Sequence, residues 1–266
     1  MVNMLVAAAL ASAIPTAPQT PAPVSEPALF VVRDSDTTIY IFGTFHALDG
    51  KSQWLGADVR NALEQSAELV LETLIPEKPS ETSLPAERLR PLLITPSASF
   101  LATTRMAIDA GRARGMQVDN GADMILRHIA ESEGKPVEGL ETLQLQINMF
   151  NRMPPSPAGG PTKAREAAAD AARFEGLAKA MAEMQAAWKR GDQSVFVRML
   201  SQLKAASPET YRMMFTERNA RWADWIRARM QAPGTVFIAV GAGHLAGPDS
   251  LLVRLAERGF ASQRVN

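Results

Sequence analysis

Two segments of this chain share one pattern, a run of β-branched and aromatic residues that ends in Gly-x-x-His. Residues 40–46 read YIFGTFH and residues 237–244 read FIAVGAGH, so the pattern includes two of only three histidines in 266 residues. Each run predicts a buried strand with an imidazole just past its end. Because open α/β sheets build their sites beyond the carboxyl ends of strands, the pattern predicts an α/β fold with a site at this edge.

The spacing of apolar residues predicts strands and helices in alternation, with a long helical insertion before the last strand. Residues 28–32 and 37–42 are expected to pair as a hairpin across the polar turn 33–36. The triplet Leu-Glu-Thr ends two strand-like segments, at 71–73 and at 140–142, which hints at a duplicated unit. The further predicted strands are 68–73, 135–140 and 235–240, and the predicted helices are 55–67, 100–114, 121–133, 164–190, 193–205, 208–231 and 251–258.

Composition excludes several classes of chemistry. The 28 basic residues balance the 28 acidic ones and form no basic stripe, so nothing in the charge supports nucleic acid as a partner. The chain has no cysteine, which excludes disulfides, thiolate ligands and a cysteine nucleophile. Two proline-rich stretches, 76–96 and 154–161, interrupt the regular elements and are predicted to be loops, the first with a short helix at 86–93.

The first 25 residues have the composition of a signal peptide and a flexible linker. An apolar run at 4–10 precedes the small residues Ala-Ser-Ala at 11–13, and a Pro/Thr/Ala tail follows to Pro23. The pattern lacks the usual basic start, since the first basic residue is Arg33, and a disordered tail is the alternative interpretation. We expect one domain over 26–266, exported to the periplasm or secreted, without a stable membrane span in the mature chain.

His46 and His244 are the first candidates for chemistry, as ligands of a divalent metal. Neutral imidazole binds such ions, and a carboxylate normally completes a hydrolytic site. Glu72 is the preferred third ligand, because a charged residue at the end of a buried strand is costly without a partner. Glu141 follows another predicted strand and is the second choice, so one of these acids is expected to bind the metal and the other to accept a proton from water.

Arg218 and Asn219 lie on the predicted late helix and offer further polar groups. Arg218 is expected either to pair locally and cover an aromatic ring or to hold a carboxylate or substrate carbonyl in a site. Two acids close to the histidines in sequence, Asp49 and Asp249, are candidates for orienting them or for capping helices.

These segments together resemble the TraB/GumN family, which includes the pheromone-shutdown protein PrgY. The resemblance rests on residues 43–46 (GTFH), 139–146 (GLETLQLQ), 217–219 (ERN) and 240–245 (VGAGHL), in that order and spacing, and it extends from about residue 28 to 260. The family looks related to the Tiki proteases and, more distantly, to erythromycin esterases and the haem-binding ChaN proteins.

The resemblance implies a mixed sheet made of two related halves, with the site between them. It also implies a metal-dependent hydrolase, peptidase-like, that uses Mn or Co rather than Zn. His46 and His244 match the motif histidines and Glu72 matches the acid after the first motif. The remaining matches are the central glutamate, Glu141, and the polar pair on the late helix, Arg218 and Asn219.

Three functions therefore follow from the sequence. The first is hydrolysis of a peptide or other small carbonyl substrate, with a divalent metal at His46, His244 and Glu72, and with Arg218 or Asn219 stabilising the oxyanion. The second is a non-catalytic or regulatory protein that binds a peptide or another envelope ligand. The third is metal-independent ester hydrolysis with His46 as the general base.

Overall fold

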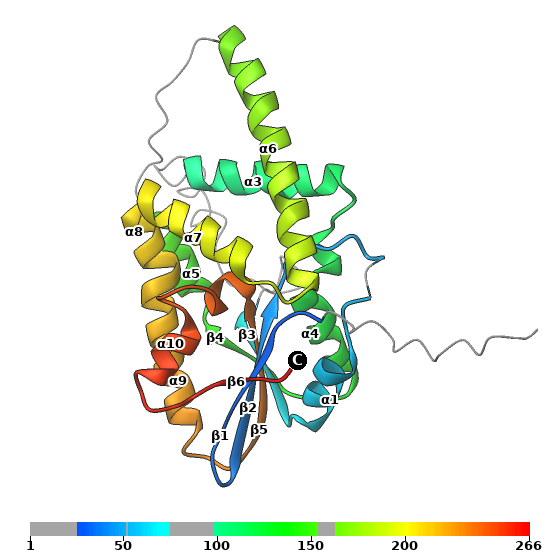
Figure 1. The fold of residues 1–266 in the computed structure, drawn as a ribbon, viewed down its shortest axis with the longest axis vertical. Coiled ribbons are helices and arrows are strands. Elements are labelled where there is room, and N and C mark those ends of the chain that lie inside the picture. Colours follow the sequence, from blue (N-terminus) through cyan, green and yellow to red (C-terminus); the bar gives the residue numbers. More distant parts are fainter. Residues whose placement is uncertain (1–25, 52, 75–97, 154–162) are drawn as a thin grey trace, which may run out of the picture.

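A computed structural model describes residues 26–51, 53–74, 98–153 and 163–266, which form a mixed sheet flanked by helices (Figure 1). The strand order is β4-β3-β5-β2-β1-β6; the first four strands are parallel, and β1 is antiparallel to both of its neighbours. The predicted α/β class and mixed sheet are confirmed. The strands are β1 (Leu29–Arg33), β2 (Thr37–Thr44), β3 (Glu68–Thr73), β4 (Val137–Glu141), β5 (Gly234–Gly241) and β6 (Gln263–Arg264).

The two strands that carry the Gly-x-x-His pattern are neighbours at the centre of the sheet. β2 and β5 pair in parallel along their whole length, and Thr44 lies opposite Gly241 at the carboxyl end. Both strands are rich in buried apolar residues, as expected for parallel strands covered on both faces. This register brings the two motifs to the same edge of the sheet at the same level.

Helices cover both faces of the sheet. Alternate residues of β5 face opposite sides, so Phe237 belongs to a core with α1, α4 and the end of α6, whereas Ile238 packs against α9 and α10. α6 extends away from the sheet toward the top of Figure 1, where it lies against α3. The helices are α1 (Ala57–Gln65), α3 (Ala98–Ala113), α4 (Ala122–Ser132), α5 (Leu143–Asn151), α6 (Lys163–Lys189), α7 (Ser194–Ala206), α8 (Pro208–Tyr211), α9 (Glu217–Arg229) and α10 (Leu251–Ala256).

The predicted helical insertion is confirmed, with one difference. Helices α5 to α9 lie between β4 and β5 in the chain. The single helix predicted over 208–231 is instead interrupted by a π-helical turn, Arg212–Thr216. Ser207 precedes α8, with proline at the first turn, and its hydroxyl bonds to the Thr210 side chain and not to a backbone amide.

Two other findings concern the ends of the fold. The short edge strand β6 was not predicted, because its two residues are exposed and carry no apolar pattern. None of the described helices is long and apolar enough to cross a membrane. The predictions for 1–25, 76–96 and 154–161 concern residues outside those described.

Candidate active site

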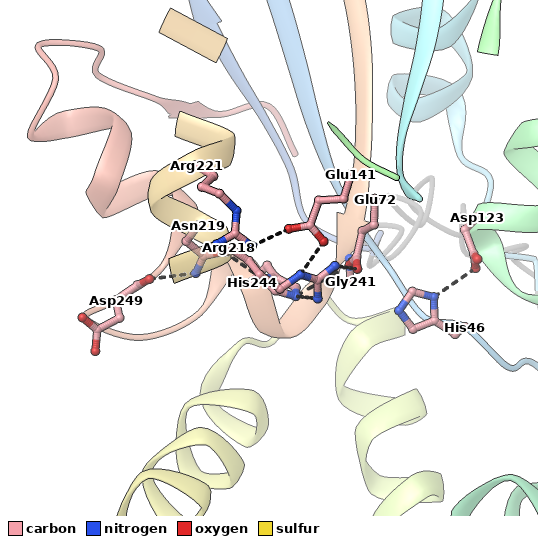
Figure 2. A network of polar contacts seen from close by, with 10 residues as sticks. All are labelled: His46, Glu72, Asp123, Glu141, Arg218, Asn219, Arg221, Gly241, His244 and Asp249. Carbon is pink, nitrogen blue, oxygen red and sulfur yellow. Dashed lines mark hydrogen bonds and ion pairs between the residues drawn. The ribbon is translucent and has the colours of Figure 1, made fainter. Parts of the chain in front are cut away.

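The carboxyl ends of the four parallel strands carry four of the predicted site residues (Figure 2). Glu141 is the last residue of β4 and Glu72 is next to last in β3. His46 comes two residues after β2, and His244 lies on the short 3₁₀ turn that follows β5. The remaining two, Arg218 and Asn219, approach from the first turn of α9. The structure therefore brings all six together at one edge of the sheet.

Glu72, His46 and His244 converge over Gly241. A β-carbon placed on Gly241 would lie 3.1 Å from Glu72 Oε1, 3.1 Å from His46 Nε2 and 3.8 Å from His244 Cδ2. Glu72 Oε1 also accepts a 2.6 Å hydrogen bond from the Gly241 amide. Glycine at this position thus leaves the space in which the three side chains meet.

His244 is buried and held in one tautomer. Its Nδ1 lies 2.7 Å from Asn219 Oδ1, and Asn219 Nδ2 donates a 2.7 Å hydrogen bond to the Asp249 carbonyl. Because the second bond orients the amide, His244 Nδ1 carries the proton and Nε2 is left unprotonated, as an acceptor. Burial lowers the pKa of His244 to about 3, against the opposing charge of Glu72, so the ring is neutral at neutral pH.

His46 has the opposite electrostatic environment. Its side chain is 58% exposed, and Nδ1 lies 3.3 Å from Asp123 Oδ1. Desolvation lowers its pKa, but the Asp123 carboxylate outweighs that effect and raises the pKa of His46 to about 9. The imidazole therefore carries a proton at neutral pH in the metal-free protein. Gly121 permits this contact, since a β-carbon there would lie 2.5 Å from the His46 carbonyl oxygen.

Arg218 connects the two acids to His244. Its guanidinium is 3% exposed and donates through Nη2 to Glu72 Oε2 at 2.8 Å and through Nε to Glu141 Oε2 at 2.9 Å. Nη1 lies 3.3 Å from His244 Nε2, and the group stacks 4.6 Å above the ring of Trp222. Burial raises the pKa of Glu72, but the Arg218 guanidinium, together with the Gly241 amide, outweighs this effect and holds that pKa well below its usual range.

Glu141 and Asn219 have every polar end engaged. The second oxygen of Glu141 accepts a 2.9 Å hydrogen bond from Arg221, so both of its oxygens are bound by arginines. Asn219 bonds His244 with one end and the backbone at Asp249 with the other. In this geometry Glu141 positions Arg218, and Asn219 positions His244.

Two features escaped the sequence analysis. Asp123 and not Asp49 pairs with His46, while Asp49 pairs with Lys189 at 3.5 Å. Arg221 was not singled out as a site residue. It lies about one helical turn after Arg218 on α9, and its side chain bonds Glu141. The only available signal for Asp123 was its place in the first turn of a predicted helix, a position that acids often occupy for other reasons.

The last turn of α6 and the residue before α7 contact both motif segments. Trp188 Nε1 donates a 2.7 Å hydrogen bond to the carbonyl of Gly43, the first residue of the first motif. Gln193 Nε2 donates to the carbonyl of Leu245, directly after His244, at 3.2 Å. The helical insertion thus supports the site from outside the sheet.

A pocket of about 240 Å³ opens beside His46 and Glu72. It lies between the ends of β2 and β3 and the start of α4. Its lining mixes polar and apolar side chains, and a group placed there would contact two of the three converging residues, His46 and Glu72. The other lining residues are Thr44, Leu71, Thr73, Val118, Asp123, Met124, Arg127, Gln146 and Ala239.

The chemical types of the donor atoms on His46, His244 and Glu72 suit a divalent cation, but their observed positions do not form a complete site. Two imidazole nitrogens and one carboxylate oxygen are common ligands for Mn, Co and Zn, and each imidazole has its other nitrogen facing an acceptor. No cluster of three or more His, Asp or Glu with metal-binding spacing is found within the described ranges. Arg218 Nη1 contacts His244 Nε2, so a cation can bind to this nitrogen only if the contact opens.

Comparison with known proteins gives one match. The family model described as the TraB/PrgY/gumN family matches residues 28–96 and 80–264, which include all four of the resembling segments. No curated protein and no solved structure gives a significant match. The resemblance is confirmed at the level of this family, and the wider similarity to Tiki proteases and erythromycin esterases stays a prediction.

Proposed function

Because this chain belongs to the TraB/PrgY/gumN family, we propose that it is a metal-dependent hydrolase acting on a peptide or similar carbonyl substrate. The observation that carries the proposal is the convergence of His46, Glu72 and His244 within 4 Å of one point above Gly241. Two imidazoles and one carboxylate facing a single space are the ligand set of hydrolytic metal centres.

Each converging residue has a part in this proposal. His46 and His244 present Nε2, and Glu72 presents Oε1, to the position that a Mn or Co ion would take. When bound, the ion supplies a water of lowered pKa and polarises the scissile carbonyl. His46 must release its proton for this, since a ligating imidazole is neutral.

The residues behind the ligands support the proposal by their geometry. Arg218 Nη1, once it leaves His244 Nε2, becomes a free donor beside the reacting space and can stabilise an oxyanion. Asn219 keeps the His244 lone pair directed at that space. Glu141, with both oxygens bound by arginines, holds Arg218 and leaves the ligand position to Glu72.

We place this activity outside the cytoplasm. The composition of residues 1–25 supports export, followed by a domain over 26–266. Hydrolysis of envelope or extracellular peptides would suit that location.

Metal analysis of the purified full-length chain tests the proposal, together with activity on a peptide library in the presence of Mn, Co or Zn. We expect about one Mn or Co per chain, and product that disappears with a chelator. The His46→Ala/His244→Ala double variant should lose both. Equal and negligible metal in the wild type and the variant would overturn the metal proposal.

The contact between Arg218 and His244 favours a second candidate, a protein that captures a peptide without turnover. A guanidinium standing in front of His244 Nε2 completes a polar pocket without any ion. Such a protein would show peptide-dependent shifts in melting temperature and no product under any metal. The third hypothesis, with His46 as a general base, is disfavoured because a pKa near 9 leaves the ring protonated at neutral pH.

A further inference from the structure

The floor of the pocket beside His46 contains a buried hydroxyl that none of the roles above uses. Thr44, the last residue of β2, is 1% exposed, and its Oγ1 has no hydrogen-bond partner within the described part of the chain. Thr73, the last residue of β3, lines the same pocket, and its buried Oγ1 likewise lacks a partner there. A buried hydroxyl without a partner destabilises a fold, so two of them in one pocket indicate a group that binds them.

The charges of the pocket indicate what kind of group this is. The charged side chains of the lining already have partners, since Glu72 bonds Arg218, Asp123 lies against His46 and Arg127 bonds Glu131. A charged substrate group would therefore find no unpaired counter-charge in a partly desolvated space, among the residues that line it. The apolar part of the lining accepts a hydrocarbon side chain, and its members are Leu71, Val118, Met124 and Ala239.

We propose that Thr44 and Thr73 form the hydrogen-bonding floor of a substrate subsite, which receives the main-chain amide and apolar side chain of a peptide residue next to the scissile bond. A threonine hydroxyl both donates and accepts, so two of them match the carbonyl and the N–H of one amide. The pocket is smaller than the roughly 300–1,000 Å³ typical of sites that enclose a whole ligand, which fits one residue of a longer chain. The inference rests on the proposed function and specifies its substrate.

Two threonines at opposite ends of β2 allow a matched test. Thr37 is also 1% exposed, but its hydroxyl lies 3.1 Å from Asp36 Oδ1 and 3.1 Å from the Ala232 carbonyl. Thr44→Val removes a hydroxyl without a partner, and Thr37→Val removes a bonded one. We expect Thr44→Val to keep or raise the melting temperature and to weaken substrate binding about tenfold, the effect of losing one hydrogen bond. Thr37→Val should melt lower and bind normally.

Binding is measured in the full-length protein by ¹H–¹⁵N NMR titration with N-acetyl-leucinamide, and activity by hydrolysis of leucine-containing peptides. Shifts at the ends of β2 and β3 that weaken in Thr44→Val but not in Thr37→Val support the subsite, even if the wild type hydrolyses nothing and the proposed function fails. Three results would each overturn the inference. They are equal binding of N-acetyl-leucinamide by Thr44→Val and the wild type, no binding of this amide, and binding of glucose instead of the amide.

Discussion

Arg218 Nη1 lies 3.3 Å from His244 Nε2, on the lone pair that a metal ion would need. Because Asn219 fixes the proton on Nδ1, the guanidinium and a cation compete for the same nitrogen. Arg218 is also anchored to Glu72 through Nη2 and to Glu141 through Nε. Because the guanidinium is planar and rigid, Nη1 can leave His244 only if at least one of these two bonds also loosens. A cation at His244 Nε2 would therefore require this group of residues to rearrange.

Replacing Arg218 by lysine should damage both stability and activity. A lysine ammonium cannot span two carboxylates in the planar geometry of a guanidinium, so one buried carboxylate loses its partner. We expect a loss of about 3 kcal/mol in the free energy of unfolding and roughly 100-fold in kcat/KM. Urea denaturation and peptide hydrolysis measure the two. Arg221→Lys is the control, because Arg221 is 46% exposed and bonds a single carboxylate, Glu141, among the residues that the structure describes. Equal losses in both variants would contradict the central role of Arg218.

The pairing of His46 with Asp123 should make stability depend on pH. The pKa of His46 is about 9 in the folded chain and about 6.5 when unfolded, so its stabilising effect is complete below pH 6.5 and is lost as pH rises through 9. Asp123→Asn removes the cause. We expect the wild type to melt above Asp123→Asn at pH 6 and to lose that advantage by pH 10. The difference will be small because the imidazole is exposed to solvent. A constant difference between the two proteins across this range would show that the pair does not titrate.

Glutamine substitutions should separate the roles of the two acids. Glu72→Gln removes the proposed ligand charge and should reduce Mn binding at least tenfold. Glu141→Gln loses the same kind of bond to Arg218 but should keep most of the Mn, because Glu141 faces its two arginines. Isothermal titration with MnCl₂ measures binding, and circular dichroism checks that both variants fold. Mn bound equally by Glu72→Gln and the wild type would remove Glu72 from the ligand set.

Two glycines of the second motif provide a geometric test. Gly241→Ala places a methyl group 3.1 Å from Glu72 Oε1 and His46 Nε2, so both side chains must shift. Gly243→Ala meets Phe215 at 3.4 Å and Met199 at 3.9 Å, which are ordinary van der Waals distances. We expect kcat/KM to fall about 10- to 100-fold for Gly241→Ala and to stay near that of the wild type for Gly243→Ala, with melting temperatures close together. Similar activity of the two variants would contradict the importance of the space above Gly241.

The sequence was sufficient to predict the residues at the strand ends but not the contacts between them. Periodicity locates each buried strand. Because sites in open α/β sheets lie beyond the carboxyl ends of the strands, Glu72 and His244 are then expected at one edge. Asp123 could not be paired with His46 in this way, because their contact depends on how closely α4 packs against the chain after β2. The π-helical turn was missed since its residues fit an ordinary helix, yet it precedes the turn that carries Arg218.

The register of β2 on β5, with Thr44 opposite Gly241, limits how this chain can change in length. Adding or deleting one residue within either strand would reverse which face each later side chain occupies and would pull one imidazole out of line with the other. Such a change would leave amino-acid composition almost untouched and still destroy the site. Length variation among related chains should therefore be confined to the connections and spare these two strands.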